Sequence, residues 1–153
     1  MLPKASRMIV GWQEWVALPA LGLPALKAKI DTGAKTSALH THSIEPYGPA
    51  RRRKVRFSVR PRPDDDLEVV ATADVVDQRE VTSSNGVREL RYVIETDLSL
   101  GGRRWPIEVT LTNRVHMAYR MLIGRQAIPT DMLVDCAASF RQRRLSYRLY
   151  AAE

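Results

Sequence analysis

The residues with the clearest chemical potential are Asp31, Thr32 and Gly33, which follow one another in the first third of the chain. Glycine lets another backbone approach a tight turn closely, so the carboxylate there is free of bulky neighbours. The threonine hydroxyl can fix the turn by hydrogen bonding. Two such carboxylates brought together cannot both ionise, so they share one proton. One can then accept a proton from water while the other donates a proton to a carbonyl oxygen.

The chain contains this tripeptide only once. Paired-carboxylate chemistry would therefore require two chains, each contributing Asp31, and a homodimer is a consequence of that hypothesis. The alternative is an ordinary turn in which Asp31 or Thr32 bonds to its own backbone. The tripeptide alone is weak support, because it occurs by chance in roughly a few per cent of chains of this length.

The segments around the tripeptide favour a strand that ends in a loop. Leu26, Ala28 and Ile30 alternate with Lys27 and Lys29, which is the period of a strand with one buried face. Far downstream, residues 121–125 form a bulky apolar run that a glycine closes. Together the two segments are much less easily explained by chance than the tripeptide alone.

The rest of the chain also predicts strands. The Asn-Gly pair at 85–86 lies between two strand-like segments, and this pair is a strong hairpin signal. Residues 105–111 form a strand with positions 107, 109 and 111 inward, and residues 125–128 form one short helix that Pro129 ends. Further strands are expected at residues 8–18, 55–59, 67–81 (one long strand or a bent pair), 87–98, 132–134 and 145–150. The prediction is an all-β, barrel-like set of hairpins.

Length and composition limit the class of protein. A chain of 153 residues with 44% apolar residues predicts a single domain over residues 1–153 and excludes a disordered protein. No apolar run approaches the roughly 20 residues that cross a bilayer. Polar residues interrupt the apolar start at residues 8–10, unlike in a signal peptide. Cys136 is the single cysteine, so we expect a cytoplasmic protein with no membrane partner.

The net charge of +7 is concentrated in a basic segment, residues 51–62, which contains six arginines and Lys54. A surface of this kind favours acidic partners such as nucleic acid, anionic lipid or an acidic polypeptide. The alternative is a basic face that only contacts water.

The motifs at these positions resemble those of a known family. Residues 26–40 are similar to the signature of the bacterial retropepsin-like proteins once labelled ATP-dependent zinc proteases. Residues 11–14, 83–86, 117–125 and 134–135 resemble the same family, so the similarity covers about residues 8–140. The resemblance implies a retropepsin-like closed barrel with a hairpin flap and at most one short helix.

The resemblance also implies site residues. Asp31 would be the catalytic carboxylate of an aspartic peptidase. The other implied site residues are those of the active-site loop (Thr32, Gly33 and Ala34), of the segment that supports this loop (Leu122, Ile123, Gly124 and Arg125) and of a flap over the substrate (Ser84, Asn85 and Gly86). Residues 84–86 fit an ordinary surface hairpin as well as they fit a flap.

The chain departs from the viral members of this fold at one position. Those enzymes carry an acidic residue after Asp-Thr-Gly-Ala that pairs with the later arginine, but this chain has Lys35. We therefore expect Arg125 to pair with Asp131 or Asp135 instead.

No motif supports a metal or another cofactor, and we expect neither. The chain lacks His-Glu-x-x-His and the glycine spacing of a phosphate-binding loop. His40 and His42 would share one face of a strand, but a third zinc ligand would have to come from His116, Cys136 or a distant carboxylate. We expect Cys136 to be a small buried residue rather than a nucleophile.

The sequence therefore favours an aspartic endopeptidase that works as a homodimer on a peptide or protein substrate. Members of the resembled family accompany ligases that add glutamates to protein tails, which implies an acidic or glutamate-extended peptide. The alternative function is a non-catalytic retropepsin-like module that binds acidic peptides or, less favoured, nucleic acid through residues 51–62.

Overall fold

The computed structural model describes residues 7–83, 85–113 and 119–151. These residues form strands and short 3-10 turns, and no α-helix occurs among them, so the all-β prediction is confirmed. The strands are β1 (Met8–Gly11), β2 (Gln13–Leu18), β3 (Leu23–Asp31), β4 (Ser37–His40), β5 (Ser43–Tyr47), β6 (Lys54–Val59), β7 (Val69–Asp74), β8 (Asp77–Thr82), β9 (Arg88–Leu100), β10 (Arg103–Thr112), β11 (Met121–Gly124) and β12 (Met132–Asp135). The 3-10 turns are η2 (Pro19–Leu21), η3 (Ala50–Arg52), η4 (Arg125–Ala127) and η5 (Tyr147–Ala151).

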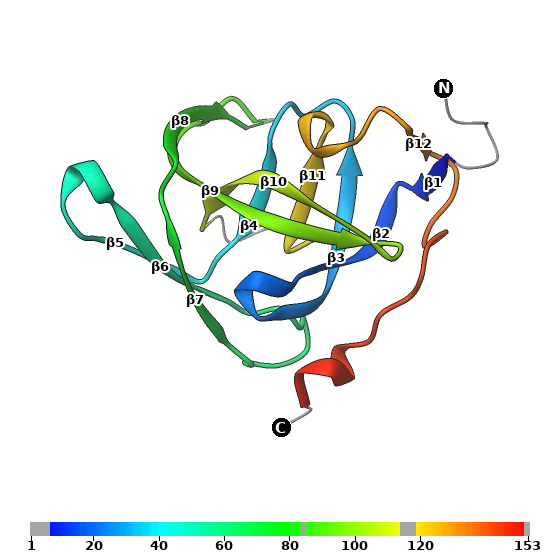
Figure 1. Cartoon of the computed structure of the whole chain (residues 1–153), viewed down its shortest axis with the longest axis horizontal. Coiled ribbons are helices and arrows are strands. Elements are labelled where there is room, and N and C mark those ends of the chain that lie inside the picture. Colours follow the sequence, from blue (N-terminus) through cyan, green and yellow to red (C-terminus); the bar gives the residue numbers. More distant parts are fainter. Residues whose placement is uncertain (1–6, 84, 114–118, 152–153) are drawn as a thin grey trace.

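Six strands close into a barrel (Figure 1). They follow the order β10-β4-β11-β3-β2-β9, and the antiparallel pairing of β9 with β10 completes the ring. β8 pairs with β9 outside this ring. Within the barrel, β3 runs parallel to β11, and β4 runs parallel to β10. The closed, retropepsin-like barrel expected from the sequence is therefore confirmed.

Alternation of apolar residues places one face of each barrel strand in the core. Leu26 and Ala28 of β3 are fully buried, as the alternation predicts. On β10, Ile107, Val109 and Leu111 are all at most 5% exposed, so the predicted inward face is confirmed. Burial of these side chains supplies most of the driving force for closing the barrel.

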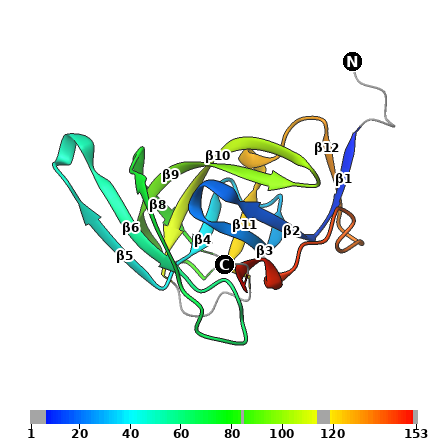
Figure 2. The same cartoon turned by 60° about the horizontal axis from the view of Figure 1, so that its bottom comes forward.

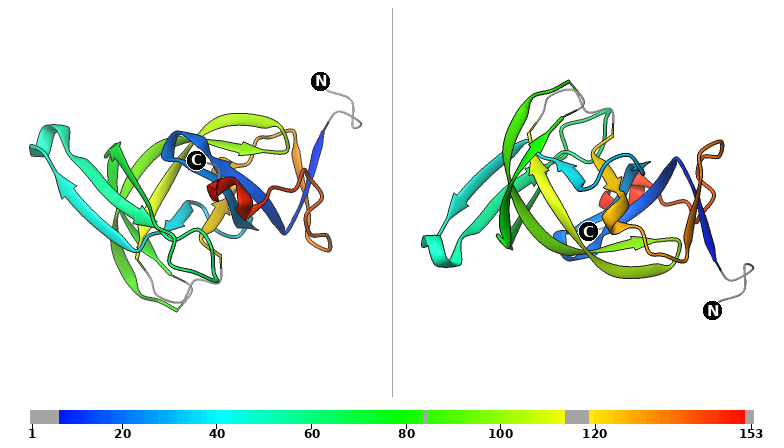
Figure 3. Two further views of the ribbon diagram at one scale, coloured as in Figure 1. Left: turned by 90° about the horizontal axis from the view of Figure 1, so that it is seen from below. Right: turned by 90° about the horizontal axis from the view of Figure 1, so that it is seen from above.

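Two smaller sheets lie on opposite sides of the barrel (Figures 1 and 2). One is the three-stranded sheet β5-β6-β7, whose β5–β6 hairpin projects away from the barrel in every view (Figure 3). The other is the parallel pair of β1 and β12. The expected bent pair at residues 67–81 is real, because β7 joins the first of these sheets and β8 joins the barrel strand β9.

The predicted strand at residues 145–150 is wrong, because this segment ends in the turn η5. The Tyr150 hydroxyl donates to the backbone oxygen of Ala25 at 2.5 Å and lies 3.3 Å from the backbone nitrogen of the same residue. This side-chain anchor on β3 replaces strand pairing. Burial raises the pKa of Tyr150 to about 12.

The predicted strand at residues 8–18 is divided into β1 and β2 at Trp12. Glu14 is fully buried there, and its carboxylate accepts hydrogen bonds from the backbone of Gly11, Arg141 and Gln142 at 2.7–3.1 Å. Three backbone donors compensate for the burial of this charge and tie the C-terminal segment to the barrel. Within the described part of the chain, no helix is long and apolar enough to span a membrane.

Candidate active site

Asp31 is the last residue of β3, where the strand turns into the loop 32–36. The backbone N–H of Gly33 donates to Asp31 Oδ1 at 3.0 Å, and the N–H of Ala34 donates to the Asp31 backbone oxygen at 3.2 Å. Among the described residues, Asp31 Oδ2 has no hydrogen-bond partner. The carboxylate is therefore oriented through one oxygen, and the other is available to water or to a second carboxylate.

β11 lies beside β3 and supports the loop. Gly124 is in register with Asp31 across the parallel pair. A Cβ atom on Gly124 would lie 2.5 Å from the Thr36 backbone oxygen and 2.9 Å from its nitrogen, so only glycine allows this contact. The Gly124 N–H also donates to the buried Ser37 Oγ at 3.1 Å. The supporting segment expected at 122–125 is thus packed directly on the loop, while its part in catalysis stays a prediction.

The turn η4 holds the loop from the same side. The backbone N–H groups of Arg125 and Gln126 donate to the backbone oxygens of Ala34 and Lys35 at 2.8 and 3.2 Å. The Arg125 guanidinium donates to the Gly33 backbone oxygen at 3.1 Å. Three hydrogen bonds from two residues therefore fix consecutive positions of the loop.

The expected ion pair of Arg125 is wrong. Asp131 instead forms a two-point pair with Arg103 at 3.1 and 3.2 Å, and Asp135 pairs with Arg141 at 3.5 Å. The Arg125 guanidinium is oriented by the Gly33 backbone oxygen, so a carboxylate at position 35 is not required to orient it.

The β8–β9 hairpin predicted around Asn85-Gly86 is confirmed. The Ser83 N–H donates to the Val87 backbone oxygen and the Gly86 N–H donates to the Ser83 backbone oxygen, both at 2.9 Å. Gly86 has a φ of +83°, which glycine adopts without strain. The predicted flap residue Ser84, like His116 and residues 117–118, lies outside the described residues. The role of this hairpin as a flap remains a prediction.

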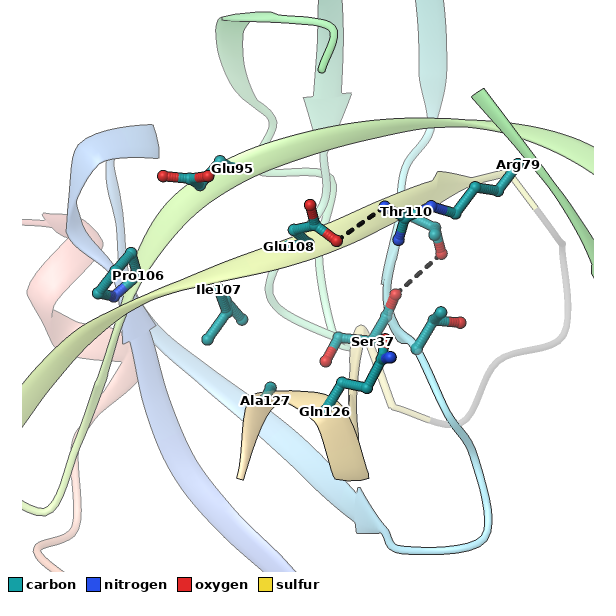
Figure 4. A pocket seen from close by; sticks show the side chains of 10 residues that line it. Ser37, Arg79, Glu95, Pro106, Ile107, Glu108, Thr110, Gln126 and Ala127 are labelled. Carbon is teal, nitrogen blue, oxygen red and sulfur yellow. Dashed lines mark hydrogen bonds and ion pairs between the residues drawn. The ribbon is translucent and has the colours of Figure 1, made fainter. Parts of the chain in front are cut away.

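A cleft of about 740 Å³ is shared by the active-site loop and the hairpin strand β8. Its lining combines residues 33–36 of the loop with residues 79–82 of β8, and Glu108 and Gln126 complete it. A second cavity of about 440 Å³, whose lining is drawn in Figure 4, lies along β10. The two share Thr36, Arg79, Glu108 and Gln126.

Two groups of charged residues connect the hairpin to the barrel. Arg79 of β8 pairs with Asp77 at 2.7 Å and with Glu108 of β10 at 2.9 Å (Figure 4). Arg91 of β9 is only 7% exposed and pairs with Glu89 at 3.1 Å.

The second group continues into the loop. The Arg91 guanidinium donates to Thr110 Oγ1 at 3.3 Å, and Thr110 Oγ1 donates to the Ser37 backbone oxygen at 2.9 Å. Since Ser37 also binds Gly124, a continuous set of hydrogen bonds joins the base of the hairpin to the segment beneath the loop.

Sequence reasoning did not find these residues. Charged residues in a strand are usually solvent-exposed, so Arg79 and Arg91 carried no signal of their own. A usable signal existed in the spacing, because Asp77 and Arg79, and likewise Glu89 and Arg91, are opposite charges two positions apart on one strand. Residues two apart lie on the same face and can pair.

The histidines do not form a metal centre with other described residues. No group of three or more His, Cys, Asp or Glu side chains that could hold a metal ion occurs in residues 7–83, 85–113 and 119–151. His42 Nε2 lies 3.1 Å from an Arg60 nitrogen. Burial and the nearby charges of Arg120 and His42 lower the pKa of His40. Cys136 is exposed, so the expectation of a buried cysteine is wrong.

Comparison with known proteins gives a family. Residues 9–144 match the sequence profile of the family described as RimB-like, retropepsin-like aspartic endopeptidase RimB. A protein of Legionella pneumophila, Lpg0085, is described as having unknown function. Its crystal structure superposes with a TM-score of 0.72 at 30% identity, over 90% of this chain and 100% of that chain.

Longer proteins also contain a similar segment. A probable alpha-L-glutamate ligase of Parasynechococcus marenigrum is 48% identical over 130 residues, which are 84% of this chain and 28% of the ligase. A probable alpha-L-glutamate ligase of Shewanella pealeana is 44% identical over 136 residues, which are 88% of this chain and 30% of the ligase. The chain therefore spans less than a third of the length of these relatives.

Proposed function

Since the chain belongs to the RimB-like family of retropepsin-like aspartic endopeptidases, we propose that it hydrolyses peptide bonds as a homodimer with one Asp31 from each subunit. The catalytic pair would form where two active-site loops meet on the two-fold axis. The substrate would be an acidic peptide, in particular a glutamate-extended one.

The proposed chemistry needs one proton shared by the two carboxylates. The ionised Asp31 removes a proton from water, and the water oxygen attacks the carbonyl carbon of the peptide. The protonated Asp31 of the other subunit donates its proton to the carbonyl oxygen. Collapse of the resulting tetrahedral intermediate breaks the C–N bond as the nitrogen takes up a proton, and it releases a carboxylate and an amine.

One observation carries the proposal: Asp31 ends a barrel strand and begins a loop that Gly124 and Arg125 hold, and residues 33–36 of this loop line a cleft together with the hairpin strand β8. A carboxylate fixed through one oxygen is oriented before substrate arrives, which reduces the entropic cost of the reaction. The hairpin would exclude water and pair with the extended peptide backbone.

The acidic substrate is supported by two separate features. The relatives that contain a similar segment are named probable alpha-L-glutamate ligases, and the name describes an enzyme that joins glutamate to its substrate. The net charge of +7 would also attract an acidic chain. Cleavage should consequently become slower as salt concentration increases.

The test is cleavage of a peptide pool that includes glutamate-rich members, with a metal chelator present. We expect wild type to cleave and Asp31→Asn to lose at least about a hundredfold in rate, because the variant lacks the shared proton. Asp66→Asn is the matched control, since Asp66 is exposed. Equal cleavage by wild type and Asp31→Asn would exclude Asp31 as the catalyst. Sedimentation with peptide present tests the dimer, and a strict monomer that still cleaves would refute the two-subunit mechanism.

A second candidate function is favoured by the exposure of the basic segment. Arg51, Arg52 and Arg56 are exposed in and beside the projecting β5–β6 hairpin. We infer from this surface a non-catalytic module for acidic peptides or nucleic acid. In that case the triple replacement of Arg51, Arg52 and Arg53 by alanine would weaken binding, while Asp31→Asn would leave it unchanged.

A further inference from the structure

We propose that Lys35 binds a substrate carboxylate beside the scissile bond, once from each subunit, so that the protein prefers acidic residues on both sides of the bond it cleaves. This inference rests on the proposed homodimeric peptidase and assigns its charge selectivity to one residue of the active-site loop.

The position of Lys35 is the first support. It lies four residues after Asp31, it lines the cleft that β8 also lines, and it is exposed. Its backbone oxygen accepts a hydrogen bond from Gln126, so the start of the side chain is held in place beside the cleft. The ammonium group can therefore reach into the cleft without any movement of the loop.

The state of the other charges is the second support. Arg79, the second cation of the cleft, is already paired with Asp77 and Glu108, and Figure 4 shows the latter contact. Glu80 pairs with Arg88 at 3.4 Å. Lys35 has no ion-pair partner among the described residues. A carboxylate that enters the cleft consequently finds one cation whose charge is not already neutralised.

The neighbouring cavity limits where acidic residues are accepted. Glu95 and Glu108 both line it, and only Glu108 has a cationic partner among residues 7–83, 85–113 and 119–151 (Figure 4). A substrate carboxylate placed there would meet the uncompensated charge of Glu95. The cleft therefore offers an unpaired positive charge at Lys35, and the adjoining cavity offers an unpaired negative charge at Glu95. We expect the preference for an acidic residue at one substrate position per subunit rather than along the whole peptide.

In a symmetric dimer, the carboxylate-binding position at Lys35 occurs twice. In a two-fold dimer the same residue approaches the site from both subunits, so two Lys35 side chains flank the shared Asp31 pair. A peptide crosses this site in one direction and presents one side of its scissile bond to each subunit. The favoured substrate accordingly has an acidic residue on each side.

The experiment uses peptides of one sequence that carry glutamate or glutamine on either side of the scissile bond, in all four combinations. For wild type we expect each glutamate to increase kcat/KM by about tenfold, which corresponds to about 1.4 kcal/mol. Lys35→Met should remove the preference on both sides, and Lys35→Arg should retain it. Lys29→Met is the matched control. Lys29 is exposed on β3, and its replacement removes one positive charge, as Lys35→Met does.

A binding measurement separates this inference from the proposed function. Peptide affinity is measured in the Asp31→Asn background, with and without Lys35→Met, so the result does not depend on cleavage. Tighter binding of glutamate peptides that disappears with Lys35→Met supports the assignment even if wild type cleaves nothing. Equal binding of glutamate and glutamine peptides, absence of binding, or a preference that survives Lys35→Met overturns it.

Discussion

Replacing Gly124 by alanine should disturb the loop 32–36 more than replacing Gly33, the glycine within that loop, by alanine. The new Cβ would lie 2.5 Å from the Thr36 oxygen, 2.6 Å from its carbonyl carbon and 2.9 Å from its nitrogen. These are backbone atoms, which cannot rotate away as a side chain can. Restoring an ordinary distance of 3.4 Å requires a separation of about 0.9 Å between β11 and the loop.

The size of the effect follows from two losses. Excess volume in a packed site costs about 1–3 kcal/mol. The shift also stretches the buried hydrogen bond from Gly124 to Ser37 Oγ, now 3.1 Å, which is worth about 1 kcal/mol. We therefore expect the free energy of unfolding to fall by about 3 kcal/mol and the Tm by about 6–12 °C for a chain of this size. For the proposed peptidase, a displacement near 1 Å at the Asp31 loop would lower kcat/KM by about a hundredfold.

Thermal and urea unfolding of Gly124→Ala and Gly33→Ala test this reasoning. Gly33 belongs to the same loop, but its Cβ would meet only the Asp31 carboxylate at 3.3 Å and its φ is not positive. Gly33→Ala should therefore lose less than about 1 kcal/mol of stability. If the two variants unfold at the same temperature, close packing of β11 on the loop does not constrain position 124.

Two further predictions concern a buried and a half-buried ionisable group. Glu14→Gln should lower the free energy of unfolding by about 3 kcal/mol, because an amide cannot accept all three backbone N–H groups, whereas Glu45→Gln on the exposed strand β5 should change little in the same urea titration. For His40, the folded chain takes up a proton less readily than the unfolded chain, so its contribution to stability is complete above pH 6.5 and is lost as pH falls through its lowered pKa. Unfolding measured from pH 7.5 to 5 should show a smaller loss for His40→Gln than for wild type, and an equal loss would refute this assignment.

Much of the fold was predictable from local pattern. The alternation at residues 26–30 and 105–111 predicted strands whose apolar side chains are buried, and Asn85-Gly86 predicted the hairpin. Alternation is informative because neighbouring side chains of a strand point to opposite faces. The strand predicted at residues 145–150 does not form. A hydroxyl anchored on Ala25 holds that segment to the barrel in place of a strand partner.

The sequence by itself determined most of the barrel strands, the Asp31 loop and the glycine-closed segment that supports it, because period, turn residues and the small size of glycine are local properties. The barrel strand β4 (Ser37–His40) was not among the predicted strands. Only the tertiary structure decided the partner of Arg125, the exposure of Cys136 and the burial of Glu14 and Arg91. Two of the three backbone donors to Glu14, those of Arg141 and Gln142, lie 127 and 128 residues away in the chain. A charge is buried only where such distant donors meet it, and no local pattern records that meeting.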